Sequence, residues 1–471
     1  MVFENRMYRK VKCIFFFSLV FLGFLSSTFC QEFYKVSNIT VSGNIRTKSA
    51  IILREISFKT GDSLSVLNFE KVVERSKQNI VNTNLFLSVD FIKELNNKDF
   101  SLTIVVKERL YLIALPILYL ADRNINEWWY DRGRDITRIT FGINGKHFNL
   151  TGNNDQLKFK AFGGFIPYFE LAYSKPYIDK RKRIGINTGA FYSTQRTMPF
   201  RTWNDKLDFF QTDNRMRERK GAFFEIRLRN ALYHFHSIYL GYTQSKIADT
   251  ISILNPNYFG TKQTFQQVFS IIYDYKFDKR DNRQYPLAGD LFYGQISNFI
   301  INGKETTNQL NVSMLYAKYL KLSNRFYLES SIRAKFSTPK RQFYPLINGL
   351  GYGNNLVRGF DLYVIDGQHT FILKNALKYQ AFKKVFNLSS IIKLRQFNSL
   401  PVALYPSLFF DYGYVKNYFP AFSNSKLSNI PLKGGGLGLD VVTWYDTTAK
   451  MNYSLNHLAE KRFFFGIFRD F

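Results

Sequence analysis

The sequence predicts a membrane β-barrel of sixteen antiparallel strands, preceded by one small α+β domain. Three observations predict this fold. From residue 109 onward, runs of ten or more residues alternate between apolar and polar side chains, whereas strands of soluble proteins are typically about 5 to 6 residues long. After residue 30, no run of 18 apolar residues occurs, which excludes membrane-spanning helices. The first 30 residues also have the layout of an export signal.

In that segment, four basic residues precede an apolar run from Cys13 to Leu25, and small residues follow. We expect cleavage after Cys30, because the apolar run is short for a retained anchor of about 20 residues. Phe29 stands where a lipoprotein would have a small residue, which disfavours a lipid on Cys30. Since both cysteines lie in the predicted signal peptide, disulfide and thiolate chemistry are excluded from the mature chain.

The composition narrows the class of protein further. The chain is 45% hydrophobic and 18% aromatic, which excludes a disordered protein. Beyond residue 30, 61 Lys and Arg stand against 35 Asp and Glu, a net charge of +26. This charge suggests an anionic partner, either nucleic acid or an anionic membrane surface, and an exported protein rarely meets nucleic acid. Because the basic residues are spread over the whole length and form no concentrated arm, solvated faces and loops are the simpler interpretation.

Residues 31–108 form the predicted small domain, in the order strand, helix, helix, strand, strand. The first strand ends in the turn Gly43-Asn44, and a short helix over residues 49–56 follows. Gly61-Asp62 precedes a second helix, and two strands over 85–93 and 102–108 complete the domain. The second helix is predicted from apolar residues near helical spacing, namely Leu67, Val72, Val73 and Ile80.

Residues 109–471 form the predicted barrel. Alternation over 269–277, for example, fits a strand with one face in lipid and the other in a polar lumen. A soluble sandwich would also alternate, but the long strands and abundant Phe and Tyr favour a membrane barrel with aromatic girdles. An even strand number places both barrel ends on the periplasmic side. The sixteen strands are expected to begin near residues 109, 135, 154, 166, 181, 218, 235, 263, 287, 307, 324, 367, 400, 431, 447 and 461.

Two features stand out in the C-terminal part of the chain. One is an arginine with a possible carboxylate partner, and the other is the pattern of the last strand. Arg358 lies in Val357-Arg358-Gly359-Phe360, within a stretch rich in glycine and asparagine. Asp411 lies about fifty residues later in the strand segment Phe409-Phe410-Asp411-Tyr412-Gly413, and we expect it to receive the arginine. The final strand ends in Phe471, with Gly466 five residues before it.

Together these segments resemble the outer-membrane assembly and translocation superfamily of Bam, Tam and two-partner-secretion barrels, in which POTRA (polypeptide-transport-associated) domains precede a sixteen-stranded barrel. The similarity covers nearly the whole mature chain. In the POTRA part, the matching segments are Val41–Asn44, Ile52–Glu55, Gly61-Asp62, Asn84–Phe86 with Val89, and Val106–Glu108. In the barrel they are Asn149–Gly152, Asp278–Asn282 with Pro286 and Gly289, Val357–Phe360, and Phe409-x-Asp411-x-Gly413.

The resemblance implies roles for several residues. Val357–Phe360 falls between the eleventh and twelfth strands, in the sixth extracellular loop, which folds into the lumen in this family so that its arginine pairs with the aspartate of the Phe-x-Asp-x-Gly strand. A neighbouring strand of the family often adds a glutamate, whereas Asn375-Ala376-Leu377-Lys378 carries no acid. Asp411 is therefore expected to hold Arg358 alone. Gly466 and Phe471 resemble the barrel-assembly signal, although Arg469 replaces its usual aromatic residue.

The resemblance also implies a function. We expect a non-enzymatic outer-membrane protein without cofactors, whose periplasmic POTRA domain binds extended polypeptide clients by strand addition and whose barrel opens between its first and last strands. Outer-membrane lipid, polypeptide clients and accessory periplasmic or lipoprotein subunits are the expected partners. A single POTRA unit favours an accessory member over the central assembly barrel. A passive pore, a surface receptor and the export of lipid or surface polymer are the alternatives.

Other motifs have simpler interpretations. His234 and His236 share one strand face, but a metal site would need a third ligand. The glycines at 349, 351 and 353 suggest a flexible loop, and those at 434–436 and 438 a kinked or weakly paired strand, since neither set opens a helix as a phosphate-binding loop does. Trp128-Trp129 is interpreted as an anchor at the membrane interface.

Overall fold

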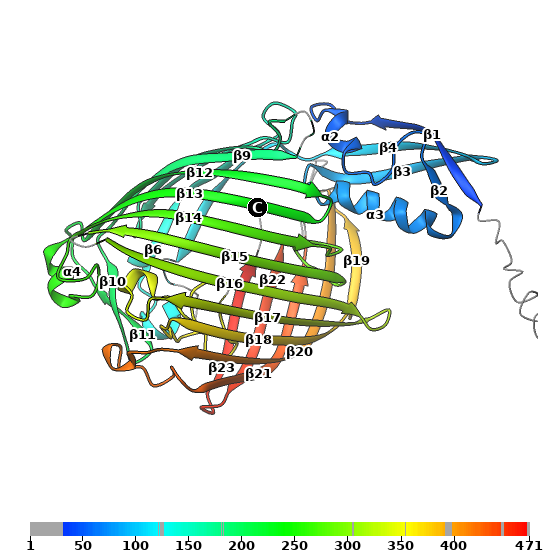
Figure 1. Ribbon diagram of the computed structural model, residues 1–471. Coiled ribbons are helices and arrows are strands. Elements are labelled where there is room, and N and C mark those ends of the chain that lie inside the picture. The colour runs from blue at the N-terminus through cyan, green and yellow to red at the C-terminus, as the bar shows by residue number, and fades with distance from the viewer. Residues whose placement is uncertain are drawn as a thin grey trace, which may run out of the picture.

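The computed structural model describes residues 32–120, 122, 127–179, 181, 183–303, 306–353, 355–390, 398–443 and 447–468. A small α+β domain lies at one end of a closed barrel (Figure 1). The predicted signal peptide and Phe471 lie outside the described residues. Within the described ranges, no helix is long and apolar enough to cross a bilayer.

The N-terminal domain is a four-stranded sheet with two helices packed on one face. Its elements are β1 (Phe33–Ser42), α2 (Ser49–Leu53), β2 (Ser63–Ser65), α3 (Phe69–Val81), β3 (Phe86–Asn96) and β4 (Asp99–Glu108). The sheet order is β2-β1-β4-β3, with β1 and β4 parallel. The predicted order is confirmed except for β2, whose three residues are too few to produce an alternating pattern.

Alternate residues of β4 provide the sheet side of this domain's core. Phe100 and Ile104 are fully buried against Ile80 of α3 and Ile52 of α2. Leu67 was predicted on the same helix face, but it lies in the turn before α3 and exposes 84% of its surface.

The described residues of the barrel form sixteen antiparallel strands, which confirms the predicted fold. Each begins within four residues of its predicted position. They are β5 (Leu112–Leu120), β6 (Ile139–Phe148), β7 (Gln156–Gly164), β8 (Tyr168–Lys175), β9 (Ile184–Gln195), β12 (Arg217–Ala231), β13 (His234–Ile247), β14 (Phe265–Asp278), β15 (Gly289–Asn302), β16 (Thr306–Lys321), β17 (Phe326–Thr338), β18 (His369–Tyr379) continued by β19 (Phe382–Asn387), β20 (Ser399–Lys416), β21 (Pro431–Val442), β22 (Thr448–Asn456) and β23 (Lys461–Phe468). Both β18 and β19 pair with β20, so they are successive parts of one strand. The ring closes where β23 meets β5.

The alternation expected for a membrane barrel is present in the wall. On β14, Phe269, Ile271 and Tyr273 each leave close to 40% of their surface exposed. Asp274 and Lys276 have the opposite parity and line a cavity in the interior. Apolar side chains are stable in such exposed positions when lipid surrounds the barrel.

Additional elements cover the end of the barrel opposite the POTRA-like domain (Figure 1). They include the hairpin β10 (Met198–Trp203) to β11 (Lys206–Phe210) and the helix α4 (Asp249–Leu254). The hairpin turn, Asn204-Asp205, has φ of 51° and 57°, as the two central residues of a type I′ turn require. This hairpin was not predicted. It packs on an apolar cluster of Met198, Phe200, Met216, Ile247, Ile251, Tyr258 and Phe259.

Candidate functional site

The structure brings Arg358 and Asp411 together inside the barrel. The backbone N–H of Arg358 donates to Asp411 Oδ2 at 3.0 Å, and its Nε donates to the same oxygen at 2.9 Å. Nη2 donates to Oδ1, so the guanidinium binds both carboxylate oxygens. The Asp411 side chain is completely buried and the Arg358 side chain is 20% exposed. The guanidinium also lies over the Phe409 ring, 3.9 Å from its centroid.

The rest of Val357–Phe360 fixes this loop tip against the inner wall. Val357 and Phe360 are buried in an apolar cluster with Leu350, Ile365, Ile372, Val415, Leu427 and Leu432. Gly359 adopts φ of +94°, which other residues resist. Gly413 leaves room for the loop, because an added Cβ would lie 2.5 Å from Val357 Cγ2.

The glycines of β21 have a role that was not predicted. Residues 434–438 are paired continuously with both β20 and β22, so the expectation of a weakly paired strand is wrong. An added Cβ at Gly434 would lie 1.9 Å from the carbonyl oxygen of Arg358. The missing side chain therefore permits the close approach of the loop tip.

Asp411 is the one carboxylate within 4.0 Å of Arg358 in the described part of the chain. Arg358 Nη2 also donates to the carbonyl oxygen of Asn375 at 3.3 Å. An acid does lie opposite Ala376, because Glu329 of β17 is its partner in the strand register. That carboxylate binds Lys378 at 2.7 Å instead.

The loop tip also contacts the hairpin that carries the last strand. Asn456, at the end of β22, donates its side-chain N–H to the carbonyl oxygen of Gly359 at 2.8 Å. The hydroxyl of Tyr363 donates to Glu460 at 2.7 Å, just before β23 begins. The sixth loop thus connects the wall at β20 with the turn between β22 and β23.

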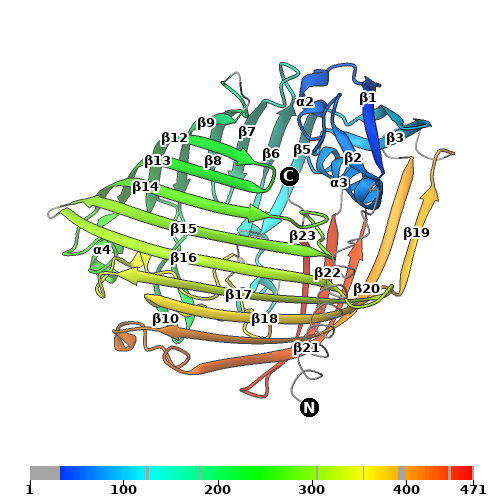
Figure 2. The same ribbon diagram turned by 45° about the vertical axis from the view of Figure 1, so that its right-hand side comes forward.

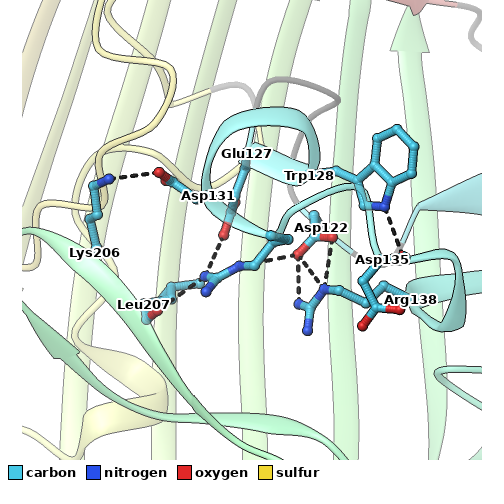
Figure 3. A network of polar contacts seen from close by, with 9 residues as sticks. Asp122, Glu127, Trp128, Asp131, Asp135, Arg138, Lys206 and Leu207 are labelled. Atoms are coloured by element: carbon cyan, nitrogen blue, oxygen red, sulfur yellow. Dashed lines mark hydrogen bonds and ion pairs between the residues drawn. The ribbon is translucent and has the colours of Figure 1, made fainter.

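A polar network that sequence reasoning missed attaches the first loop to the β10–β11 hairpin (Figure 3). Arg138 donates from Nε to both oxygens of the buried Asp122, at 2.9 and 3.1 Å. Arg132 donates to Glu127 at 2.9 Å and to the carbonyl oxygen of Leu207 at 3.1 Å. Lys206 pairs with Asp131 at 2.7 Å. The alternating strand pattern carries no sign of this network, because its members lie in the first loop and in the β10–β11 hairpin.

Asp205, in the turn of that hairpin, joins three loops. Its carboxylate accepts the backbone N–H of Lys426 at 2.7 Å and that of Leu427 at 3.0 Å, and its carbonyl oxygen accepts the N–H of Val364 at 2.8 Å. The pair Asn204-Asp205, of residue types that favour turns, is the sequence signal that could have revealed this hairpin.

The buried carboxyl group of Asp366, near the end of the sixth loop, is expected to make the stability of the barrel depend on pH. Burial raises its pKa to about 6, although a hydrogen bond from the Tyr352 hydroxyl at 2.9 Å opposes the shift. Because the pKa is higher in the folded state, the favourable contribution is complete below the unfolded value of about 4 and is lost as the pH rises through about 6. We expect the barrel to be less stable at pH 7.5 than at pH 4.5, and Asp366→Asn to flatten this difference by about 2 kcal/mol. The unfolding temperature of the original protein and of Asp366→Asn is measured as a function of pH. An unchanged profile in the variant would contradict the assignment of the pH dependence to Asp366.

The predicted POTRA turn at Gly43-Asn44 meets the Asn149–Gly152 motif of the barrel at the other end of the molecule. Gly43 has φ of +82°, and the side-chain N–H of Asn44 donates to the carbonyl oxygen of Thr47 at 2.8 Å. The Thr47 hydroxyl in turn accepts from Asn149 of the barrel at 2.9 Å. Gly61 donates its N–H to the carbonyl oxygen of Val36, and Asp62 accepts from the N–H of Lys59, both at 2.8 Å.

Other predicted residues occupy less notable positions. Gly466 pairs with Lys450 in the last hairpin. His234 and His236 each contact a tyrosine hydroxyl at 2.8 Å through Nδ1. Trp128 donates its indole N–H to the carbonyl oxygen of Asp135 at 2.8 Å, and Trp129 is half-exposed.

Comparison with known proteins identifies the N-terminal domain. Residues 34–109 match the POTRA family model, described as a surface antigen variable number repeat. No curated protein sequence matches the chain.

Several solved structures are similar to the chain. BamA from Haemophilus ducreyi lacking POTRA domains 1–3 is 14% identical, with a TM-score of 0.49 over 92% of this chain and 85% of that one. CdiB from Acinetobacter baumannii is 12% identical, with a TM-score of 0.48 over 92% and 73%. CdiB from Escherichia coli is 11% identical, with a TM-score of 0.47 over 94% and 90%. The chain therefore contains one POTRA unit, matched in sequence over residues 34–109, followed by a closed barrel of sixteen strands.

Proposed function

We propose that this protein assists the insertion or translocation of polypeptides at the outer membrane, without enzymatic chemistry. The observation that carries the proposal is the edge of the POTRA sheet. β3 has eleven residues and ends the sheet order β2-β1-β4-β3, so its outer edge has no partner strand in the described part of the chain. An extended client can add to such an edge through backbone hydrogen bonds.

The length of the strands at the seam supports opening of the barrel between β23 and β5. The described part of β23 has eight residues and β5 has nine, as short as β8 and β7, whereas β12 to β17 have 13 to 16. At about 3.3 Å per residue, the seam strands are about 26 to 30 Å long. A shorter ladder has fewer hydrogen bonds to break when the two strands part.

The sixth loop supports a braced translocation machine over a passive pore. Its tip is bound to β20 through Asp411 and to the turn before β23 through Asn456 and Tyr363. The loop therefore occupies the lumen and contacts the hairpin next to the seam. A loop held in the lumen in this way would obstruct a passive pore.

Crosslinking in cells tests the proposal. A photoreactive residue at Ile92, which is half-exposed on β3, is expected to capture extended polypeptides, whereas one at Leu67, which is more exposed but lies outside the sheet, is not. Depletion of the protein is expected to lower the levels of specific outer-membrane proteins. Equal capture at both positions, or an unchanged proteome with altered uptake of small solutes, would favour the passive pore.

A further inference from the structure

A large cavity lies between the POTRA domain and the periplasmic mouth of the barrel. Its volume is about 570 Å³, which is within the range of ligand-binding pockets. POTRA residues just after α2 and around the end of α3 form one side, and residues of β6, β7, β12, β13, β14 and β15 form the other. Figure 2 shows the domain at the same end of the barrel as β19.

The lining of this cavity is strongly basic. Nine Lys and Arg side chains line it against three carboxylates, which belong to Glu55, Glu225 and Asp274. Arg227 is paired with Glu225 at 2.8 Å, and Lys276 with Asp278 at 3.2 Å. Such an excess of one charge in a concave site attracts anions and concentrates them there.

Two cations in the barrel wall contribute to this excess. Within the described ranges, Lys158 of β7 and Arg183 before β9 have no carboxylate within 4.0 Å. On the POTRA side, Arg54 Nη1 is buried without a hydrogen-bond partner. Bound carboxylates would supply the missing partners.

One carboxylate from the POTRA domain already occupies the rim of the cavity. Glu55 is 3% exposed, and Arg229 of β12 donates to its two oxygens from Nη1 at 2.9 Å and from Nη2 at 3.1 Å. Although burial raises it, the charges of Arg229 and Arg54 hold the pKa of Glu55 below its usual value. The barrel side of the cavity therefore has a socket that binds a carboxylate through a paired guanidinium contact.

We propose that the mouth cavity binds carboxylate-rich segments of an extended polypeptide, which compete with Glu55 for Arg229. The inference rests on the proposed function and specifies which client segments the mouth receives. Twelve charged and eleven amide or hydroxyl side chains line the cavity against six apolar ones. This composition suits a polypeptide with its many polar groups better than the acyl chains of a lipid.

Competition also couples binding to the position of the POTRA domain. When a client carboxylate replaces Glu55 on Arg229, the domain loses its ionic contact with β12 and keeps the neutral contact between Thr47 and Asn149. Entry of a client would thus loosen the domain at the mouth.

Peptide binding to the full-length protein in nanodiscs of neutral lipid tests the inference. The probe is a fluorescent peptide of alternating Glu and Ser, and its twin carries Gln in place of Glu. Anisotropy is expected to show binding of the acidic peptide and about tenfold weaker binding of the twin. Lys158→Gln with Arg183→Gln is expected to weaken acidic binding about fivefold or more, while Lys262→Gln at the extracellular end changes nothing.

Glu55→Gln separates competition from a purely structural role. Because it frees Arg229, this variant is expected to bind the acidic peptide about threefold or more tightly, a gain that a misfolded protein would not produce. Equal binding of the two peptides, or weaker binding by Glu55→Gln, would overturn the inference. So would a loss of phosphatidylglycerol binding in the Lys158/Arg183 variant with no loss of peptide binding, because the site would then belong to lipid. Crosslinking from Ile92 that persists without acidic-peptide binding would overturn this inference alone and leave the proposed function standing.

Discussion

Arg358→Ala is expected to destabilise the barrel by about 3 to 5 kcal/mol, because it leaves the carboxylate of Asp411 buried without its guanidinium partner. The Asp411 side chain is completely buried, whereas that of Arg358 is one-fifth exposed. The loss of stability therefore comes mainly from the aspartate, whose charge would stay buried without its partner. The backbone N–H of residue 358 still reaches Asp411 Oδ2, which favours the lower half of the range. The unfolding temperature in detergent, followed by heat-dependent mobility on gels, measures the effect.

A solvent-exposed ion pair provides the control for this variant. Arg201 and Asp208 in the β10–β11 hairpin pair at 2.8 Å, with side chains 42% and 40% exposed. Asp208→Ala is expected to cost less than about 1 kcal/mol. Similar losses in the two variants would mean that burial does not strengthen the Arg358 pair. The double variant Arg358→Asp with Asp411→Arg exchanges the two charges. It tests whether the pair depends on which position carries each charge as well as on the presence of opposite charges. If neither single change impairs function, the pair does not brace the lumen.

The strands and their number could be predicted because alternation is a local property of the sequence. A strand with lipid on one face and a lumen on the other must change polarity at every residue, and no distant contact is needed to read that pattern. The three residues of β2 are too short for it. The β10–β11 hairpin was missed for another reason, since its strands form a separate sheet outside the barrel wall, where the constraint that produces alternation is absent.

The residues of the candidate site were only partly accessible from the sequence. Arg358 and Asp411 are 53 residues apart, and a family resemblance was needed to join them. No comparable motif indicated that Glu55 pairs with Arg229, which lies 174 residues away. An ion pair between separate domains produces no periodic pattern in the nearby sequence. The glycines of β21 were noticed but interpreted as weak pairing. The structure explains these glycines by the tip of the sixth loop, which approaches the strand closely from the lumen.

Gly434→Ala is expected to displace that loop tip and to destabilise the barrel by about 3 kcal/mol. The new Cβ would lie 1.9 Å from the carbonyl oxygen of Arg358, and overpacking of this kind costs about 1 to 3 kcal/mol. To relieve the clash, either the β21 backbone or the backbone of the loop tip must move. The first movement breaks hydrogen bonds of the β21 ladder and the second breaks the contact with Asp411, so we expect a cost at the upper end of that range. Heat-dependent mobility measures stability, and maleimide labelling of a cysteine placed at Asn348 reports movement of the sixth loop.

The neighbouring glycine supplies the matched control. An added Cβ at Gly435 meets its nearest atom, the carbonyl oxygen of Phe409, at 3.3 Å, so Gly435→Ala is expected to have a much smaller effect and to leave the loop in place. Combination with Asp411→Ala tests the mechanism. If both changes act by releasing the loop tip, their costs overlap and the double variant loses less stability than the two single variants together. Full additivity would show that Gly434 supports the strand by itself and that the loop tip does not require its missing side chain.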